Sequence, residues 1–398
     1  MTGKAIDTFI RNEREAYLAA WADQLAAKFA QRAAKHDAEG SFPFENFDDL
    51  KQAGYPKLTV SRDYGGEGLS LYEWLIVQER LARGDGSTAL SAGWHGHMML
   101  HFREACDWPE PTFSEFCRDV VSHGNMINKF ASERATGSPT RGGRPETTAV
   151  RTEGGWILNG RKTYSTLSPL LTDCIVSAGI DGQPELGDFL IRSRDGITVD
   201  ETWNTLGMRA TGSHDVVLQD VFVPDRQLLT TYIPGVSKKV NDDGDGTMLH
   251  IPACYLGIAY AARDFALQYA ANYTPNSLNE PIATLPHIRQ WIGQIESELR
   301  LARTLLYDVA DRWDREPEQR RNLRPDVGLV KYNAVHLANQ VVDKAMKIVG
   351  GAALSKDLPL ERLYRDVRAG LHNPPMEDAV IQTMARTALA ELNLGNQS

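Results

Sequence analysis

The fold is decided by the stretch TTAVRTEGGWILNGRKTYST, residues 147–166. Apolar and polar side chains alternate through most of it, and glycine-containing pairs interrupt the alternation. Alternation places successive side chains on opposite faces of a strand, so it indicates β-structure with one buried face. Gly154–Gly155 and Asn159–Gly160 are residue pairs typical of tight hairpin turns, and they predict two reversals of the chain. We therefore expect antiparallel strands in this region.

The same pattern continues on the C-terminal side of this stretch. Short runs rich in β-branched residues alternate with turn-forming residues in CIVSAGIDG (174–182), GDFLIRS (187–193), GITVDETW (196–203) and HDVVLQDVFV (214–223). Runs of this length and composition are typical of strands. They predict a middle β domain over residues 125–228, folded as an antiparallel barrel or sandwich of ordinary domain size.

The residues on either side of this β region have the periodicity of helices. Before it, apolar residues recur at helical spacing, namely Ile10, Tyr17, Leu18, Trp21, Leu25 and Phe29. After it, residues 288–315 and 327–351 carry apolar stripes at steps of three and four. Helices of that length usually belong to a bundle. The predicted fold is α+β, with an N-terminal helical domain (1–124), the middle β domain and a C-terminal four-helix bundle (229–398).

Composition limits the classes of function. Of 398 residues, 42% are hydrophobic and 24% are charged, as in an ordinary globular protein. The net charge of −9 argues against non-specific nucleic-acid binding, which needs basic surface. The four cysteines include no CxxC pair, so we predict neither a zinc site nor a disulfide framework. The charged N-terminal segment and the lack of a run of about eighteen apolar residues predict a cytoplasmic protein without a membrane span.

Five segments, in this order along the chain, resemble the acyl-CoA dehydrogenase superfamily. They are SRDYGGEGLS (61–70), FASERATGSP (130–139), GWILNGRKTYSTLSP (155–169), LGMRATGSHDVVLQDVFVP (206–224) and KIVGGAALSKDLPLERLYRDVRAG (347–370). Each segment alone is a weak signal, because glycine-rich turns and β-branched strands are common. Their ordered occurrence over nearly the whole chain is specific.

The resemblance implies a flavin cofactor, FAD or alternatively FMN. Ser132 and Thr166 match positions whose backbone or hydroxyl binds the isoalloxazine ring, and Tyr164 matches the aromatic residue that covers it. Ser165, between Tyr164 and Thr166, is also a candidate cofactor-binding residue. Gly137 and Ser138 match the phosphate-binding loop, where a glycine lets the main chain approach an anion closely. Gly350 and Gly351 match the late turn that favours FAD.

The sequence departs from the superfamily at the catalytic base. A dehydrogenase removes a proton beside the thioester with a carboxylate whose pKa is tuned by burial. The usual position for this base, eight residues after Arg365–Asp366, is Pro374. The alternative position, ahead of the first bundle helix, falls near Thr247. Glu377 follows Pro374 after a short shift along the chain and is the candidate replacement base. An acidic residue there also suits a helix N-terminus.

A second departure concerns the adenine half of the cofactor. Dehydrogenases of the superfamily carry an arginine and a Phe-Gly step early in the bundle, and both reach the dinucleotide of a neighbouring subunit. The matching positions here are Asn276, Asn279 and Glu280. FAD is therefore either held differently or replaced by FMN.

Histidines suggest a different branch of the superfamily. His95, His97 and His101 lie on one early segment and His372 lies near the C-terminus, as in the dibenzothiophene monooxygenase branch, which also lacks the glutamate. An imidazole can move a proton near neutral pH, so His95 and His372 are candidate catalytic residues. Only His97 and His101 share a helical face, so we predict no metal site.

Three functions remain open from the sequence. The first is a reduced-flavin monooxygenase or oxidase that acts on a small organic or sulfur compound. The second is an FAD-dependent acyl-CoA dehydrogenase that uses Glu377, with an acyl-CoA thioester as its substrate. The third is a flavin-binding or acyl-CoA-binding subunit without turnover. The resemblance also implies a homotetramer or a homodimer, because bundle helices of the superfamily pack between subunits.

Overall fold

The computed structural model describes residues 7–105, 108–136, 143–233, 244–390 and 392. The chain divides into two compact units, which we describe separately. The helical unit comprises Met1–Ala34, Ser70–Ala89 and Leu249–Ser398. The mixed unit comprises Lys35–Leu69 and Leu90–Met248 and contains the whole sheet. The division predicted at residues 124 and 228 differs from these units and remains a proposal.

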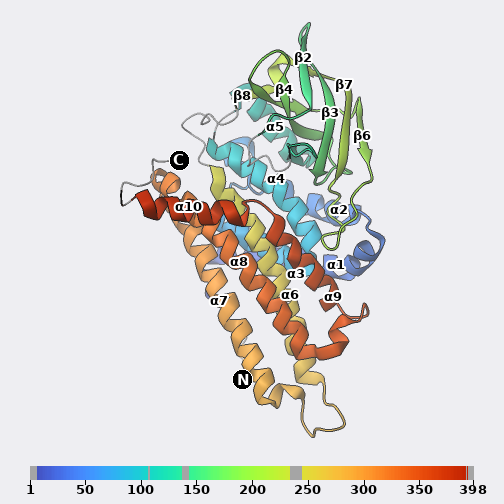
Figure 1. Cartoon of the computed structure of the whole chain (residues 1–398), viewed down its shortest axis with the longest axis vertical. Helices are drawn as coiled ribbons and strands as arrows, with labels where there is room; N and C mark the ends of the chain where they lie inside the picture. Colours follow the sequence, from blue (N-terminus) through green and yellow to red (C-terminus); the bar gives the residue numbers. More distant parts are fainter. Residues whose placement is uncertain (1–6, 106–107, 137–142, 234–243, 391, 393–398) are drawn as a thin grey trace. The chain divides into compact units, whose positions relative to one another are not determined.

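One mixed sheet of eight strands forms the β part of the mixed unit (Figure 1). Its strand order is β6-β7-β3-β2-β4-β5-β8, and β1 pairs with β4 beside this path. The strands are β1 (Ile127–Phe130), β2 (Thr148–Thr152), β3 (Gly155–Ser165), β4 (Asp173–Ile180), β5 (Leu186–Ile191), β6 (Ile197–Asp200), β7 (His214–Pro224) and β8 (Leu228–Tyr232). The predicted α+β fold with a middle β domain is confirmed.

Most neighbouring strands are antiparallel, as the sequence predicts, but β4 lies parallel to both β1 and β2. Side-chain alternation is the same in either direction of pairing, so the sequence pattern does not distinguish them. Of the two predicted hairpin turns, Gly154–Gly155 does join β2 to β3. The prediction for Asn159–Gly160 is wrong, because both residues lie inside β3.

Gly160 explains this difference. The pairing of β3 with β7 shifts register between Leu158 and Gly160, which marks a β-bulge. Gly160 has a φ of +157°, and a Cβ there would lie 2.4 Å from Thr147 Oγ1. Glycine is therefore required by a close approach inside the strand and not by a reversal.

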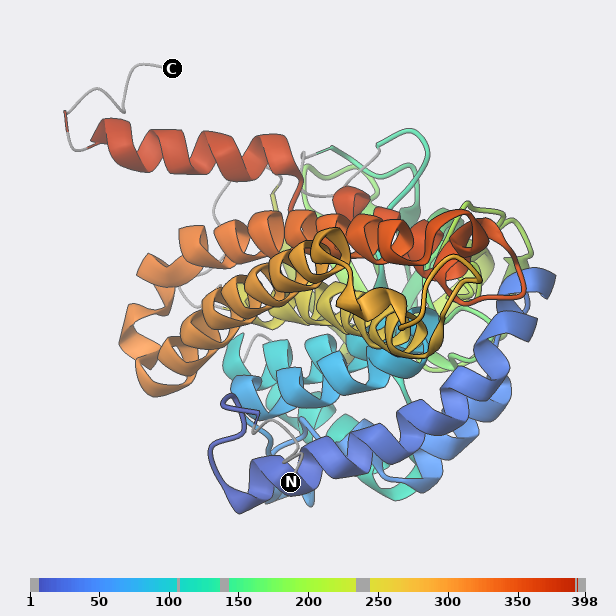
Figure 2. The ribbon, with the colours of Figure 1, turned by 90° about the horizontal axis from the view of Figure 1, so that it is seen from below.

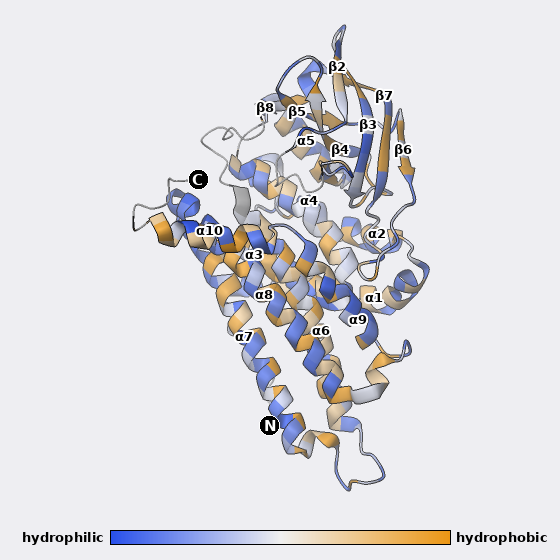
Figure 3. Cartoon of the chain, viewed as in Figure 1, coloured by the Kyte–Doolittle hydropathy of each residue, from blue (hydrophilic) through white to orange (hydrophobic). Residues whose placement is uncertain are grey.

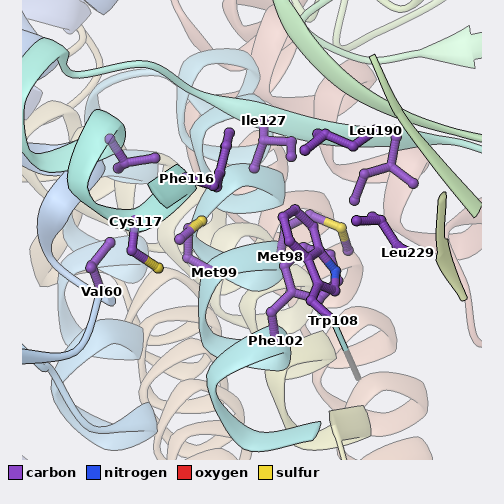
Figure 4. Packing of buried hydrophobic residues seen from close by; sticks show 12 residues of the cluster. Val60, Met98, Met99, Phe102, Trp108, Phe116, Cys117, Ile127, Leu190 and Leu229 are labelled. Carbon is purple, nitrogen blue, oxygen red and sulfur yellow. The ribbon is translucent and has the colours of Figure 1, made fainter. Parts of the chain in front are cut away.

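The core of the mixed unit packs helices against this sheet (Figure 4). Helix α4 (Gly86–Ala105) contributes Met98, Met99 and Phe102, and helix α5 (Glu110–His123) contributes Phe116 and Cys117. These side chains meet Ile127, Ile175, Leu190 and Leu229 from four strands. Burial of this apolar surface fixes the position of β1, whose C-terminal end leads into the candidate site.

Helices build the helical unit. They are α3 (Leu71–Gly84), α6 (His250–Asn272), α7 (Pro286–Arg315), α8 (Arg320–Val349), α9 (Leu360–Arg368), α10 (Glu377–Ala390) and the first part of α1 (Glu13–Glu39). Helices α7 and α8 run side by side over most of their length (Figure 2). Hydrophilic and hydrophobic residues alternate along α7, as the sequence predicts (Figure 3). Among the described helices, none is both long and apolar enough to cross a membrane.

Candidate active site

Backbone strain gathers at the C-terminal end of β3. Of the four non-glycine residues with positive φ in the described chain, three lie here: Tyr164 at 54°, Leu167 at 72° and Met208 at 54°. Side chains other than glycine rarely adopt this conformation, and it costs free energy wherever it occurs. Leu167 N–H donates to the carbonyl oxygen of Thr211 at 3.3 Å, which ties the two strained segments together. Such clustering is typical of ligand sites.

A chain of hydroxyl groups lies beside the strained residues. Thr166 Oγ1 is 2.9 Å from Ser213 Oγ, which is 2.8 Å from Thr211 Oγ1. Thr211 in turn donates to the carbonyl oxygen of Met208 at 3.1 Å. The amide of Asn128, on β1, donates to the carbonyl oxygen of Thr166 at 3.0 Å. All of these polar groups are neutral, which suits an uncharged heterocyclic edge better than an ion.

Ser165 adds an unpartnered polar atom to this cluster. It is fully buried, it pairs across the sheet with His214, and its Oγ has no hydrogen-bond partner among the described residues. Buried hydroxyls are almost always hydrogen-bonded, so an orphaned one needs an explanation. A bound group that reaches the end of β3 supplies one.

Aromatic surface is exposed next to these hydroxyls. Tyr164 is 70% exposed, although large aromatic side chains are usually mostly buried. Its ring meets Trp203 edge to face, with centroids 5.6 Å apart and an interplanar angle of 77°. The indole N–H of Trp203 donates to the carbonyl oxygen of Met208 at 3.0 Å. An open aromatic face beside neutral hydroxyls can accept a planar conjugated ring.

A buried ion pair supports this end of the sheet. Lys162 Nζ lies 2.6 Å from Glu133 Oε1, and both side chains are buried. Burial would raise the pKa of Glu133, but hydrogen bonds from Lys162 and Thr147 hold it below its ordinary value. The preceding residue, Ser132, accepts a hydrogen bond from Thr163 N–H at 2.9 Å through its carbonyl oxygen. The next predicted cofactor residues, Gly137 and Ser138, lie outside the described residues.

His95 is buried and contacts the main chain through both ring nitrogens. It is fully buried on α4; its Nδ1 accepts from Ile127 N–H at 3.1 Å and its Nε2 lies 2.9 Å from the carbonyl oxygen of Pro56. Burial lowers its pKa to about 4, so the ring is neutral near pH 7. With both nitrogens engaged by main-chain groups, His95 holds β1 in place and offers no atom to a substrate. Its predicted catalytic role has no support from this geometry.

His97 and His101 occupy another face of the same helix, as predicted. Their ring centroids are 5.9 Å apart. His97 Nδ1 lies 2.6 Å from the hydroxyl of Thr247, the residue near the alternative base position. Thr247 is fully buried. That position therefore holds a neutral hydroxyl bound to an imidazole.

The usual base position lies in the helical unit and is also neutral. Asn373, which precedes Pro374, accepts a hydrogen bond from the phenol of Tyr255. Burial raises the pKa of Tyr255 well above its ordinary value, so the phenol keeps its proton. Glu377 begins α10, and its Oε1 lies 2.9 Å from His336 Nε2. The candidate replacement base thus lies within ion-pair distance of a histidine of its own unit, without a hydrogen bond to it.

Three further predicted residues lie in the helical unit. His372 ends a short 3-10 turn and is exposed. Gly350 and Gly351 follow α8 and are also exposed, and a Cβ on either would meet no atom within 4 Å. Gly350 has a φ of +74°, which explains the glycine by backbone conformation alone. Within the described part of the mixed unit, the structure brings together four of the predicted cofactor residues: Ser132, Tyr164, Ser165 and Thr166.

Three family models match the chain in order. They describe the N-terminal domain (residues 11–103), the middle domain (129–221) and the C-terminal domain (248–371) of acyl-CoA dehydrogenase. The Bacillus subtilis protein YdbM, itself assigned only provisionally as an acyl-CoA dehydrogenase, is 46% identical over 96% of this chain and 98% of its own. The chain belongs to the acyl-CoA dehydrogenase family. The predicted superfamily and fold are confirmed.

Other members of the acyl-CoA dehydrogenase family carry different names. The amino sugar nitrososynthase RubN8 of Streptomyces rubradiris is 30% identical over 89% of this chain and 84% of its own. The solved structure of KijD3 with FMN and an amino-sugar nucleotide has a TM-score of 0.83 at 26% identity, and covers 95% of this chain and 94% of that one. These relatives are flavin-dependent enzymes, and so is this chain.

Sequence reasoning missed several residues of the candidate site. Four of them lie far along the chain from the Tyr164–Ser165–Thr166 triplet, and each looks like an ordinary strand or turn residue: Trp203, Ser213, Thr211 and Asn128. Trp203 gave the best signal, as a large aromatic at the end of a strand run followed by a polar loop. The orphaned hydroxyl of Ser165 is visible only once its surroundings are known.

Proposed function

We propose that this chain is a flavin-dependent monooxygenase or oxidase that acts with molecular oxygen on a small molecule. The observation that carries the proposal is the lack of a carboxylate at Pro374 and at Thr247, the two positions of the family base. Thr247 is hydrogen-bonded to His97, and the substitute, Glu377, lies within ion-pair distance of His336. A family member without a poised base is unsuited to removing a proton beside a thioester.

The end of β3 is the proposed flavin site. Its neutral donors and acceptors, the exposed Tyr164 ring and the orphaned Ser165 hydroxyl all suit a neutral conjugated ring. When bound, the flavin supplies the redox centre, which takes up electrons and reacts with oxygen. Thr166 and Ser213 would hold its polar edge, and Tyr164 would cover its face and exclude water. We propose FAD as the cofactor. FMN is the alternative, because Asn276, Asn279 and Glu280 replace the residues with which the family contacts the dinucleotide.

The proposed substrate is a small compound with an oxidisable nitrogen or sulfur. The names of two relatives, a nitrososynthase and KijD3 with its amino-sugar nucleotide ligand, indicate nitrogen-containing substrates for those proteins.

An anaerobic titration tests the reaction type. The flavin-loaded protein is mixed with acyl-CoA thioesters of graded chain length while the visible flavin absorbance is followed. We expect no bleaching on mixing, together with rapid oxygen uptake by the chemically reduced protein. Rapid bleaching by any thioester would overturn the monooxygenase proposal.

An acyl-CoA dehydrogenase is the second candidate, and the 46% identity to YdbM favours it. In that case Glu377 must leave His336 and act as the base. Glu377→Gln would then abolish thioester bleaching while flavin binding persisted. Bleaching that survives this change would point to a base elsewhere in the chain.

A further inference from the structure

His214 is a histidine at the candidate site that the proposed function does not use. It is the first residue of β7 and the cross-strand partner of Ser165. Its side chain is 9% exposed. The main-chain N–H of Trp203 donates to His214 Nδ1 at 3.1 Å.

This contact fixes the chemical form of the ring. A ring nitrogen that accepts a hydrogen bond carries no proton, so the neutral His214 has its proton on Nε2. Burial lowers the pKa of His214, against the weaker opposing effects of Glu201 and Asp215. Asp215 is itself paired with Arg161 and Arg134, which limits its influence. The ring therefore stays neutral, and remains an acceptor, near pH 7.

The same contact fixes Trp203. Its main-chain N–H is held by His214, and its indole N–H is held by the carbonyl oxygen of Met208. Trp203 is thus anchored through its main chain and through its indole, and it remains partly exposed. Its partner, Tyr164, has only one neighbouring aromatic contact among the described residues, namely Trp203. The geometry of this exposed aromatic pair depends on where the Trp203 main chain is placed.

We propose that His214 is a positioning residue that accepts the Trp203 main-chain N–H and thereby sets the Trp203 ring against Tyr164, so that the pair receives a planar conjugated ligand. The flavin as that ligand rests on the proposed function above. An edge-to-face pair leaves at least one face of each ring uncovered by its partner. A stacked ligand ring gains from such a face only if the pair is held rigidly, because ordering a loose ring costs conformational entropy.

Two substitutions of matched size distinguish the loss of the hydrogen-bond acceptor at residue 214 from a change in side-chain packing. In His214→Asn, Oδ1 takes the place of Nδ1 and can still accept from Trp203 N–H. In His214→Leu, the side chain has the same branching but no acceptor. Both are compared with the wild type and with Trp203→Phe. Thermal unfolding and far-UV circular dichroism establish that each variant is folded.

The first measurement uses the protein without flavin. Acrylamide quenching of Trp203 is obtained as the difference between each protein and its Trp203→Phe counterpart. We expect His214→Leu to raise the quenching constant of Trp203 about twofold, and His214→Asn to leave it near the wild-type value. Equal quenching in the wild type and His214→Leu would overturn the proposal.

The second measurement is the dissociation constant of FMN and of FAD. We expect His214→Leu to raise it about tenfold and His214→Asn about threefold or less, as for one lost hydrogen bond. In a Trp203→Ala background, which keeps the main-chain N–H but removes the ring, His214→Leu should add much less, because His214 affects the ligand through that ring. An undiminished effect there would show that His214 acts without Trp203 and would refute the positioning role. If the wild type binds neither flavin, the proposed flavin site fails, and the quenching measurement alone decides the positioning role.

Discussion

A histidine inside a flavin enzyme invites an acid–base role, and His95 shows why residue type alone is a weak guide. The sequence identifies the residue but not the partners of its two nitrogens. The structure places Ile127 N–H on one nitrogen and the Pro56 carbonyl oxygen beside the other. Such a ring links two segments of main chain, and burial keeps it neutral.

This burial predicts an acid-sensitive contribution to stability. The pKa of His95 is lowered from 6.5 to about 4 on folding, so the unfolded chain binds this proton first as the pH falls. The contribution is complete above about pH 6.5 and is lost progressively down to about pH 4. The total loss is about 3 kcal/mol. His95→Gln can accept and donate at similar positions without titrating.

Denaturant unfolding of the two proteins checks this at a series of pH values. The free energy of unfolding of the wild type should fall relative to His95→Gln by about 1 kcal/mol between about pH 6.5 and about pH 5.5. A constant difference across this range would contradict a neutral, buried His95. Flavin binding near pH 7 should be the same in both proteins.

The role of Thr166 is testable through flavin retention. Thr166→Val keeps the shape but removes the hydroxyl from the chain that includes Ser213. We expect flavin affinity to fall about tenfold, with a shifted visible spectrum, because one hydrogen bond is lost and Ser213 keeps only Thr211 as a hydroxyl partner. Thr166→Ser, the matched control, should retain both. An unchanged spectrum and affinity in Thr166→Val would remove Thr166 from the ring contacts.

At the scale of elements, close backbone approaches decide which glycines matter. A Cβ on Gly84, at the end of α3, would lie 2.1 Å from the carbonyl oxygen of Ala26 on α1. Gly293 lies exposed on α7, where a Cβ would meet no atom within 4 Å. The two glycines therefore respond to alanine in opposite directions.

Gly84→Ala forces two helices of the helical unit apart, and we expect it to cost about 2 kcal/mol or more. Gly293→Ala should stabilise by about 0.5–1 kcal/mol, since alanine restricts the unfolded chain and favours a helix. Thermal and denaturant unfolding of both variants checks the prediction. A tolerated Gly84→Ala would mean that α1 and α3 do not approach at this residue.

Elements were predictable where a local pattern fixes them. The helices α7 and α8 and the β2–β3 hairpin follow directly from periodicity and glycine placement. Asn159–Gly160 was not predictable, because the same residues form a turn or a bulge according to what approaches them, here Thr147. The parallel pairs of β4 likewise depend on contacts between segments distant in sequence.

At the scale of the whole molecule, the sequence predicted the site only in part. It predicted Tyr164, Ser165 and Thr166, because these residues are consecutive at the C-terminal end of β3. Asn128, Trp203 and Ser213 join that triplet only through the sheet, since β1, the loop after β6 and the start of β7 are brought to one place by strand order. Local patterns carry no information about that order.

Self-association is also a property of the whole molecule. A groove between α7 and α8 is lined by Leu301, Leu305 and Leu337, and Leu301 is 61% exposed. Exposed apolar surface of this kind is typical of subunit contacts. We expect a homotetramer or a homodimer by sedimentation equilibrium, and a shift to smaller species in Leu301→Asp. Tyr17→Asp, at a 67% exposed residue of α1, is the control. A monomeric wild type would contradict the assembly.

The hydroxyl chain at the end of β3 has a direction. The Thr211 hydroxyl donates its single proton to the carbonyl oxygen of Met208, so it can only accept a hydrogen bond from Ser213. Ser213 then donates to Thr211 and accepts from Thr166. Thr166 thus offers lone pairs, and no proton, to whatever lies on its other side. A redox ligand that gains a proton at the atom facing Thr166 is therefore held more tightly once reduced, which raises its reduction potential.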